Sequence, residues 1–214
     1  MAKKNLKGIF ITFEGPEGSG KSTQSKLLFR FLRARGYKAV FLREPGGTRV
    51  SEKIRRILLD RRNDSMTAQS EMLLYMAARA QLVREVILPA LSRGEIVVCD
   101  RFLDSTRAYQ GFGLGLDLHL INAVGNFVTA GLRPALTILL DLPVEKGLRH
   151  RAANRDRIEK RAFAYHACVR RAYHILARRE PGRFKIVKVN KDRDVTQAKI
   201  RTIALGILKR KRKL

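Results

Sequence analysis

The residues best suited to chemistry form one short motif near the start of the chain. Residues 15–22 read GPEGSGKS and satisfy the spacing G-x-x-x-x-G-K-[ST]. Glycines let backbone N–H groups turn inward around a phosphate, Lys21 neutralises phosphate oxygens, and Ser22 offers a hydroxyl to Mg²⁺. The motif follows an apolar run and precedes a helix-like segment, whose positive end favours an anion. The sequence therefore predicts a nucleoside triphosphate site formed by Gly15, Pro16, Glu17, Gly18, Ser19, Gly20, Lys21, Ser22 and Thr23.

A second chemical group is the carboxylate that ends the apolar run 96–100, which reads IVVCD. P-loop enzymes place an acid at the end of a neighbouring strand, where it orients Mg²⁺ and its water ligands. Asp100 alone is equally consistent with an ordinary capping residue, but the phosphate loop upstream favours the metal role. We therefore expect Mg²⁺ to be held by Ser22 and, through water, by Asp100.

These groups need a scaffold, and the apolar pattern predicts an α/β fold. Short β-branched runs alternate with segments whose apolar residues recur every three or four positions. The runs are almost continuously apolar, as in strands covered on both faces of a parallel sheet. Lys185 and Lys188 interrupt the last run, which predicts an edge strand. The expected strands are 9–13, 39–42, 96–99, 136–142 and 184–189.

The helical pattern predicts helices that flank this sheet, with Gly36 and Gly94 ending two of them. Asp194 and Gln197 resemble a capping box at the start of the last helix. The expected helices are 22–35, 51–59, 66–91, 116–130, 158–179 and 195–208. Without repeats or a Pro/Ser-rich linker, we expect a single domain over residues 1–214, with a lid at about 149–157 and a basic tail at 209–214.

Composition excludes several classes of protein. The chain has 214 residues, of which 45% are hydrophobic, so disorder is excluded. No apolar run approaches the roughly 20 residues of a membrane span, and the first residues lack a signal-peptide pattern, so we expect a cytoplasmic protein. Two isolated cysteines, Cys99 and Cys168, make no disulfide framework. The net charge of +26 is spread along the chain, so nucleic-acid binding is expected to be non-specific at most.

The classes of P-loop protein differ in their further motifs. A GTPase switch requires D-x-x-G and then N-K-x-D, whereas residues 189–193 read VNKDR, with Arg193 in place of the aspartate. A helicase or motor is usually longer and carries an acidic pair where Asp100 is followed by Arg101. The size and motifs therefore favour a small kinase.

Four further segments carry a specific resemblance. They are REPGGT at 43–48, LYMAAR at 74–79, DRFLDSTRAYQG at 100–111 and DRIE at 156–159. In this order and spacing, the chain resembles thymidylate kinases of the bacterial type. The resemblance implies a P-loop nucleoside monophosphate kinase fold with a short lid, a homodimer, and Mg²⁺-dependent in-line transfer from ATP to dTMP. The product would be dTDP, a step in dTTP synthesis.

The resemblance also implies roles for individual residues. Tyr75, where the family usually has Phe, stacks on thymine, and Arg79 reaches a base carbonyl. Arg55 and Arg101 bind the dTMP phosphate, for which a guanidinium fork is suited. Glu14 faces the 3′-hydroxyl, Glu44 lies near the acceptor phosphate and magnesium, Thr106 and Gln110 contact the thymine edge, and Tyr109 crowds out a ribose 2′-hydroxyl. The implied dTMP site is Glu14, Glu44, Arg55, Tyr75, Arg79, Arg101, Ser105, Thr106, Tyr109 and Gln110.

The phosphate loop has no basic residue at its variable positions, as in bacterial-type members of the family, so charge compensation must come from elsewhere. Arginines in the polar segment after the fourth strand could close over ATP and neutralise the transferred group. Those candidates are Arg149, Arg151, Arg155 and Arg157, and the sequence does not choose among them. The expected catalytic residues are Lys21, Arg101, Arg149, Arg151 and Arg155.

Two alternative functions stay open at this point. One is a kinase for another nucleoside monophosphate, which would keep the fold and change the base pocket. The other is a non-catalytic, ATP-dependent P-loop protein that binds nucleic acid through its basic surface. The acceptor phosphate of the favoured reaction is already deprotonated at neutral pH, so that reaction requires alignment and charge neutralisation but no general base.

Overall fold

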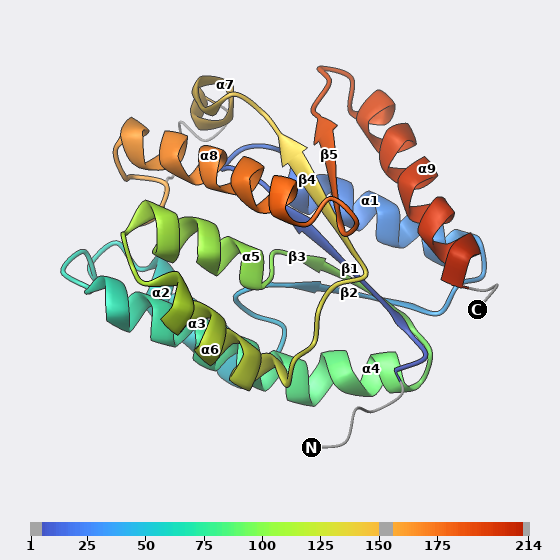
Figure 1. Ribbon diagram of the computed structural model, residues 1–214, viewed down its shortest axis with the longest axis horizontal. Coiled ribbons are helices and arrows are strands. Elements are labelled where there is room, and N and C mark those ends of the chain that lie inside the picture. Colours follow the sequence, from blue (N-terminus) through green and yellow to red (C-terminus); the bar gives the residue numbers. More distant parts are fainter. Residues whose placement is uncertain (1–5, 150–155, 212–214) are drawn as a thin grey trace.

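The computed structural model describes residues 6–149 and 156–211 and contains one five-stranded parallel sheet (Figure 1). The strand order is β2-β3-β1-β4-β5, so the predicted parallel sheet and the edge position of the last strand are both confirmed. Phe13 at the end of β1 pairs with Asp100 at the end of β3, which brings both ends to the same edge of the sheet. The strands are β1 Ile9–Glu14, β2 Ala39–Arg43, β3 Ile96–Asp100, β4 Leu136–Asp141 and β5 Phe184–Lys188.

Helices cover both faces of this sheet (Figure 1). Two segments, η1 and η2, are π-helical and continue the helices before them without a break. The helical elements are α1 Lys21–Ala34, α2 Arg49–Leu59, α3 Ala68–Leu82, η1 Val83–Ile87, α4 Leu88–Ser92, α5 Leu103–Thr106, η2 Arg107–Gly113, α6 Leu118–Thr129, α7 Val144–Arg149, α8 Phe163–Arg179 and α9 Arg193–Lys211. None of these helices, within the described ranges, is long and apolar enough to cross a membrane.

The core lies on the two faces of the sheet because adjacent strand residues point to opposite sides. On one face, Phe10 and Val97 pack with Met72 of α3 and with η1, α4 and α6. On the other face, Ile11 and Val98 pack against α1 and α9. Every residue of β3 and β4 is buried, which is why those strands read as continuous apolar runs.

Three helix predictions need correction. The expected helix 66–91 is α3, η1 and α4, whose winding changes before Pro89, a residue that has no N–H to donate. The expected helix 158–179 begins only at Phe163, because residues 156–160 form a turn around the Asp156 side chain. Asp194 does not cap the last helix, since α9 begins at Arg193 and Asp192 accepts from the N–H of Asp194 at 2.7 Å.

The predicted glycine ends are confirmed, because Gly36 and Gly94 have left-handed φ of 80° and 78° after α1 and α4. Such φ values favour glycine. Cys99 is buried and Cys168 is half-buried, and both are free thiols. The segment 103–113, for which the sequence predicted no helix, forms α5 and η2 and carries four of the expected dTMP-binding residues.

Candidate active site

The phosphate loop connects β1 to α1, as its motif requires. A Cβ on Gly18, where φ is +68°, would lie 2.0 Å from the carbonyl oxygen of Gly147 in α7, so that position admits only glycine. A Cβ on Gly15 would lie 2.4 Å from the carbonyl oxygen of Leu140 in β4. The loop is therefore held against β4 and α7, with the N-terminus of α1 behind it.

Lys21, the first residue of α1, curls back over this loop. Its Nζ donates to the carbonyl oxygen of Pro16 at 2.7 Å and to Ser19 Oγ at 3.4 Å. Burial, followed by the positive charge of Arg101, lowers the pKa of Lys21 to about 8. An anion in the loop would oppose both effects and hold the ammonium group in its charged form.

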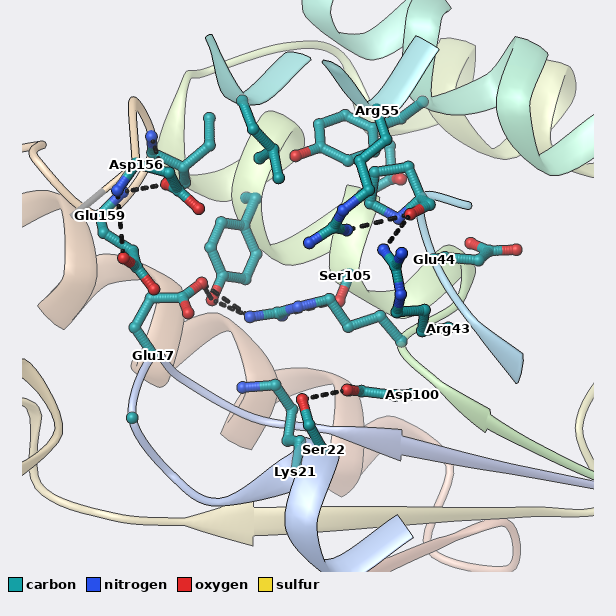
Figure 2. A pocket seen from close by; sticks show the side chains of 18 of the residues that line it. Glu17, Lys21, Ser22, Arg43, Glu44, Arg55, Asp100, Ser105, Asp156 and Glu159 are labelled. Carbon is teal, nitrogen blue, oxygen red and sulfur yellow. Dashed lines mark hydrogen bonds and ion pairs between the residues drawn. The ribbon is translucent and has the colours of Figure 1, made fainter. Parts of the chain in front are cut away.

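Ser22 and Asp100 meet where α1 begins and β3 ends. Ser22 Oγ donates to Asp100 Oδ2 at 2.5 Å, as Figure 2 shows. Asp100 Oδ1 is buried and has no hydrogen-bond partner. A hydroxyl beside a carboxylate oxygen that still needs a partner suits a hydrated Mg²⁺, so the predicted metal pair fits the group.

A pocket of about 420 Å³ lies beside this pair. Figure 2 shows Glu17, Lys21 and Arg55 pointing into the same space from the loop, α1 and α2. Of the predicted residues, the pocket is lined by Glu17, Gly18, Gly20, Lys21, Ser22, Thr23, Glu44, Arg55, Tyr75, Asp100, Arg101, Ser105, Thr106, Tyr109 and Gln110. It is also lined by six residues that the sequence did not single out as lining it, namely Arg43, Pro45, Leu59, Asp156, Ile158 and Glu159.

Arg101 lies between the phosphate loop and the α5–η2 segment. Its backbone φ of +72° is left-handed, a conformation that costs a non-glycine residue about 1–3 kcal/mol. Its guanidinium donates to Glu17 Oε1 at 2.7 Å, to Ser105 Oγ at 3.1 Å and to Tyr109 OH at 3.2 Å. The predicted phosphate-binding arginine is thus held in place from three sides.

Glu17 is one of five acidic residues that line this pocket. Its Oε1 accepts from Arg101 and, at 2.8 Å, from the hydroxyl of Tyr109. Burial alone would raise the pKa of Glu17, but the charges of Arg101 and Lys21 outweigh it and lower the pKa to about 2. Glu17 is therefore ionised and spans the triphosphate loop and the expected dTMP phosphate site.

Glu14, the last residue of β1, is fully buried and is not one of the residues that line the pocket. Its Oε1 accepts from the N–H of Phe102 at 2.8 Å, and its Oε2 accepts from Ser105 Oγ at 2.6 Å and Tyr173 OH at 2.9 Å. Burial, together with the charge of Asp104, raises the pKa of Glu14 to about 7. The structure therefore differs from the expectation that this carboxylate faces the sugar.

Arg79 is also absent from the pocket wall, with only 1% of its surface exposed. Its guanidinium is within 2.6 Å of Glu44 Oε2 and donates to Thr106 Oγ1 at 3.0 Å and to the carbonyl oxygen of Phe102 at 3.1 Å. Glu44 does line the pocket, and its Oε1 is buried without a partner. Arg79 thus supports Glu44 and Thr106 from behind.

Arg55 of α2 and Arg43 at the end of β2 also line the pocket. Arg55 Nη1 donates to the carbonyl oxygen of Pro45 at 3.0 Å, and Arg43 Nη1 donates to the same oxygen at 3.3 Å (Figure 2). The Glu44–Pro45 peptide bond is cis. Arg43 lines the pocket beside the predicted Arg55, and its place at the start of the REPGGT segment is the signal that could have identified it.

The four candidate lid arginines fall in different places. Arg149 ends α7 and is exposed, whereas Arg157 has its guanidinium turned into the protein, where it donates to Glu71 Oε2 at 2.5 Å and to the carbonyl oxygen of Leu58 at 3.0 Å. Arg151 and Arg155 lie outside the described residues. The buried contacts of Arg157 make it a fixed part of the turn 156–160 rather than a group free to reach ATP.

Comparisons with known proteins agree with this geometry. The family model described as Thymidylate kinase matches residues 13–200. The chain is 49% identical over 210 residues to a thymidylate kinase of Geotalea daltonii, covering 94% of this chain and 98% of that one. It is 46% identical over 207 residues to a thymidylate kinase of Pseudomonas putida, covering 96% and 99%.

A solved structure gives the same assignment. The crystal structure of thymidylate kinase from Ehrlichia chaffeensis superimposes with a TM-score of 0.76 at 31% identity, covering 92% of this chain and 98% of that one. Fold, phosphate loop and sequence therefore agree, and the chain belongs to the thymidylate kinase family.

Proposed function

We propose that this chain transfers the γ-phosphoryl group of ATP to dTMP and releases dTDP and ADP. One observation carries the proposal. A single pocket joins the phosphate loop and Lys21 to a second region lined by Arg55, Arg101 and Tyr75. Two phosphate-binding regions that share one cavity suit a reaction in which both substrates are phosphates. The chain is accordingly a phosphotransferase of the dTTP-forming route.

The donor half of the site is the loop and the start of α1. The loop N–H groups and the N-terminus of α1 would surround the ATP phosphates, and Lys21 would leave Pro16 to neutralise their oxygens. Ser22 and Asp100 would hold Mg²⁺, which supplies charge neutralisation on the phosphate oxygens when it is bound. Arg149, Arg151 and Arg155 stay as proposed partners of the transferred group.

The acceptor half is lined by α2, α3 and the α5–η2 segment. Arg55 and Arg101 would bind the dTMP phosphate, and the ring of Tyr75 would stack on thymine. Arg101 must then exchange part of its contact with Glu17 for substrate oxygens. Both carboxylate oxygens of Glu14 already accept hydrogen bonds, from Phe102, Ser105 and Tyr173. We therefore propose that Glu14 positions Ser105 and that Glu17 is the acid that faces the sugar.

Catalysis in this arrangement consists of alignment and charge neutralisation. The acceptor phosphate is ionised at neutral pH, so no side chain has to remove a proton from it. Lys21 and Arg101, on neighbouring walls of the pocket, would hold donor and acceptor in line. The buried setting strengthens both interactions by excluding water.

The exposed apolar side chains support a homodimer within this proposal. Phe127 and Leu120 on α6 are 84% and 50% exposed, and Leu73 on the adjoining α3 is 54% exposed. A monomer gains nothing from such residues in water, whereas a second copy would bury them. We include a cytoplasmic location in the proposal, since the proposed reaction uses free nucleotides.

The direct test is ADP formation with ATP and Mg²⁺ across dTMP, dUMP, UMP, CMP, GMP and AMP. We expect a strong preference for dTMP that is lost in Lys21→Ala. Preference for another monophosphate would refute the acceptor and leave the fold assignment intact. Activity that survives in Lys21→Ala would show that the signal comes from a contaminating kinase.

A further inference from the structure

Glu71 is a buried carboxylate that the proposed mechanism does not use. It lies in the first turn of α3 with none of its surface exposed. It is four residues before Tyr75 and eight before Arg79, so all three occupy the same face of the helix. Glu71 therefore lies just behind the ring proposed to stack on the acceptor base.

The two oxygens of Glu71 have different partners. Oε1 accepts from Gln110 Nε2 at 2.8 Å. Oε2 accepts from Arg157 at 2.5 Å and from Arg161 at 2.7 Å. Two guanidinium groups thus compensate the buried charge at Oε2, while Oε1 contacts the amide of Gln110, which lines the pocket.

The bond to Gln110 fixes which end of that amide is available. A carboxylate with two cationic partners accepts hydrogen bonds and donates none, so it can face only the NH₂ end of the amide. The carbonyl oxygen of Gln110 is then turned away from Glu71. Gln110 is 2% exposed and has little freedom to leave this orientation.

We propose that Glu71 is a positioning residue that fixes the carbonyl oxygen of Gln110 as the acceptor offered to the substrate base, which selects a pyrimidine with N–H at position 3. The inference rests on the proposed placement of the base beside Tyr75 and Gln110. Thymine and uracil carry a hydrogen at N3, whereas N3 of cytosine is an acceptor and would oppose the carbonyl oxygen. The discrimination is a property of the pair, because a free amide can present either end.

Replacing Glu71 with glutamine removes this constraint with little change in shape. The new amide can donate to the carbonyl oxygen of Gln110, so the NH₂ group of Gln110 can turn to the base. We expect the ratio of kcat/KM for dTMP to that for dCMP to fall about ten- to a hundredfold in Glu71→Gln, mainly through KM. The ratio of the two dissociation constants, measured by calorimetry without ATP, should fall in parallel.

Arg161→Gln is the matched control. It removes a partner of Glu71 Oε2 and leaves the contact of Oε1 with Gln110 in place. We expect the ratio to be unchanged in this variant. An equal loss in Arg161→Gln and Glu71→Gln would overturn the proposal, because it would assign the effect to the arginine cluster. If Glu71→Gln does not fold, the charge-balanced variant Glu71→Gln/Arg161→Gln gives the same comparison against Arg161→Gln.

The double variant Glu71→Gln/Gln110→Glu exchanges the two groups and gives the decisive rescue. Residue 110 then again offers only acceptor oxygens to the base, so the preference for dTMP should return towards the wild-type ratio. A ratio as low as that of Glu71→Gln would overturn the proposal, since a supporting role alone predicts no rescue. Absence of dTMP turnover in the wild type would refute the proposed function, and the dissociation constants would still report on Glu71.

Discussion

Replacing Arg79 with methionine should lower the free energy of unfolding by about 3–5 kcal/mol, the usual cost of leaving a buried charge unpaired. Arg79 is 1% exposed, and Glu44, its partner at 2.6 Å, is 6% exposed. The variant also removes the donors to Thr106 Oγ1 and to the carbonyl oxygen of Phe102. For a chain of this size, the loss corresponds to a decrease of about 6–20 °C in Tm.

The assay is urea unfolding followed by circular dichroism, with two variants for comparison. Arg79→Met/Glu44→Leu should recover most of the loss, because an apolar pair leaves no unpaired charge. Arg62→Met removes the exposed pair with Asp60 and should leave stability unchanged. A loss below about 1 kcal/mol in Arg79→Met, or a double variant no more stable than the single one, would refute the buried-pair interpretation.

Three further predictions concern titration and the metal. The pKa of Glu14 is raised from 4.5 to about 7, so between these pH values the folded state binds more protons than the unfolded state. The free energy of unfolding should therefore fall by up to about 3 kcal/mol from pH 4.5 to 7 and level off above pH 7. In pH-dependent denaturation, Glu14→Gln should lack this decrease. The lowered pKa of Lys21, about 8, predicts that kcat/KM for ATP declines above pH 8 in steady-state assays; a profile flat to pH 10 would contradict it. In a magnesium titration, Asp100→Asn should raise the Mg²⁺ concentration for half-maximal activity about 10- to 100-fold, with no change in Tm beyond a few degrees. An unchanged Mg²⁺ concentration for half-maximal activity would argue against the metal role of Asp100.

The parts that the sequence predicted are those fixed by local pattern. The strands were predicted correctly because β3 and β4 are buried along their whole length and are therefore apolar, apart from Thr137 and the aspartates Asp100 and Asp141 that end them. The phosphate loop read correctly because its glycines are needed at backbone positions such as Gly18, where a Cβ would meet α7. Both patterns are visible in a short stretch of sequence, although the contacts that select them come from other parts of the chain.

The parts that it could not predict depend on partners far along the chain. Glu14 looked like a substrate ligand, but Tyr173, 159 residues later, occupies its Oε2. Arg157 looked like a mobile lid charge, but Glu71 turns it inward across 86 residues. The start of α8 was missed because Asp156 accepts from two N–H groups and holds a turn over an otherwise helical pattern. Residue types and spacing do not encode these competing hydrogen bonds.

Phosphoryl transfer from ATP to dTMP is tested most directly by following the phosphoryl group itself. ATP labelled at the γ-phosphate would be incubated with the protein, Mg²⁺ and dTMP, and the products separated by chromatography. We expect the label to appear in dTDP at the rate of ADP formation, and no label to enter dTDP with Lys21→Ala. Label released as inorganic phosphate at that same rate, with none in dTDP, would contradict it.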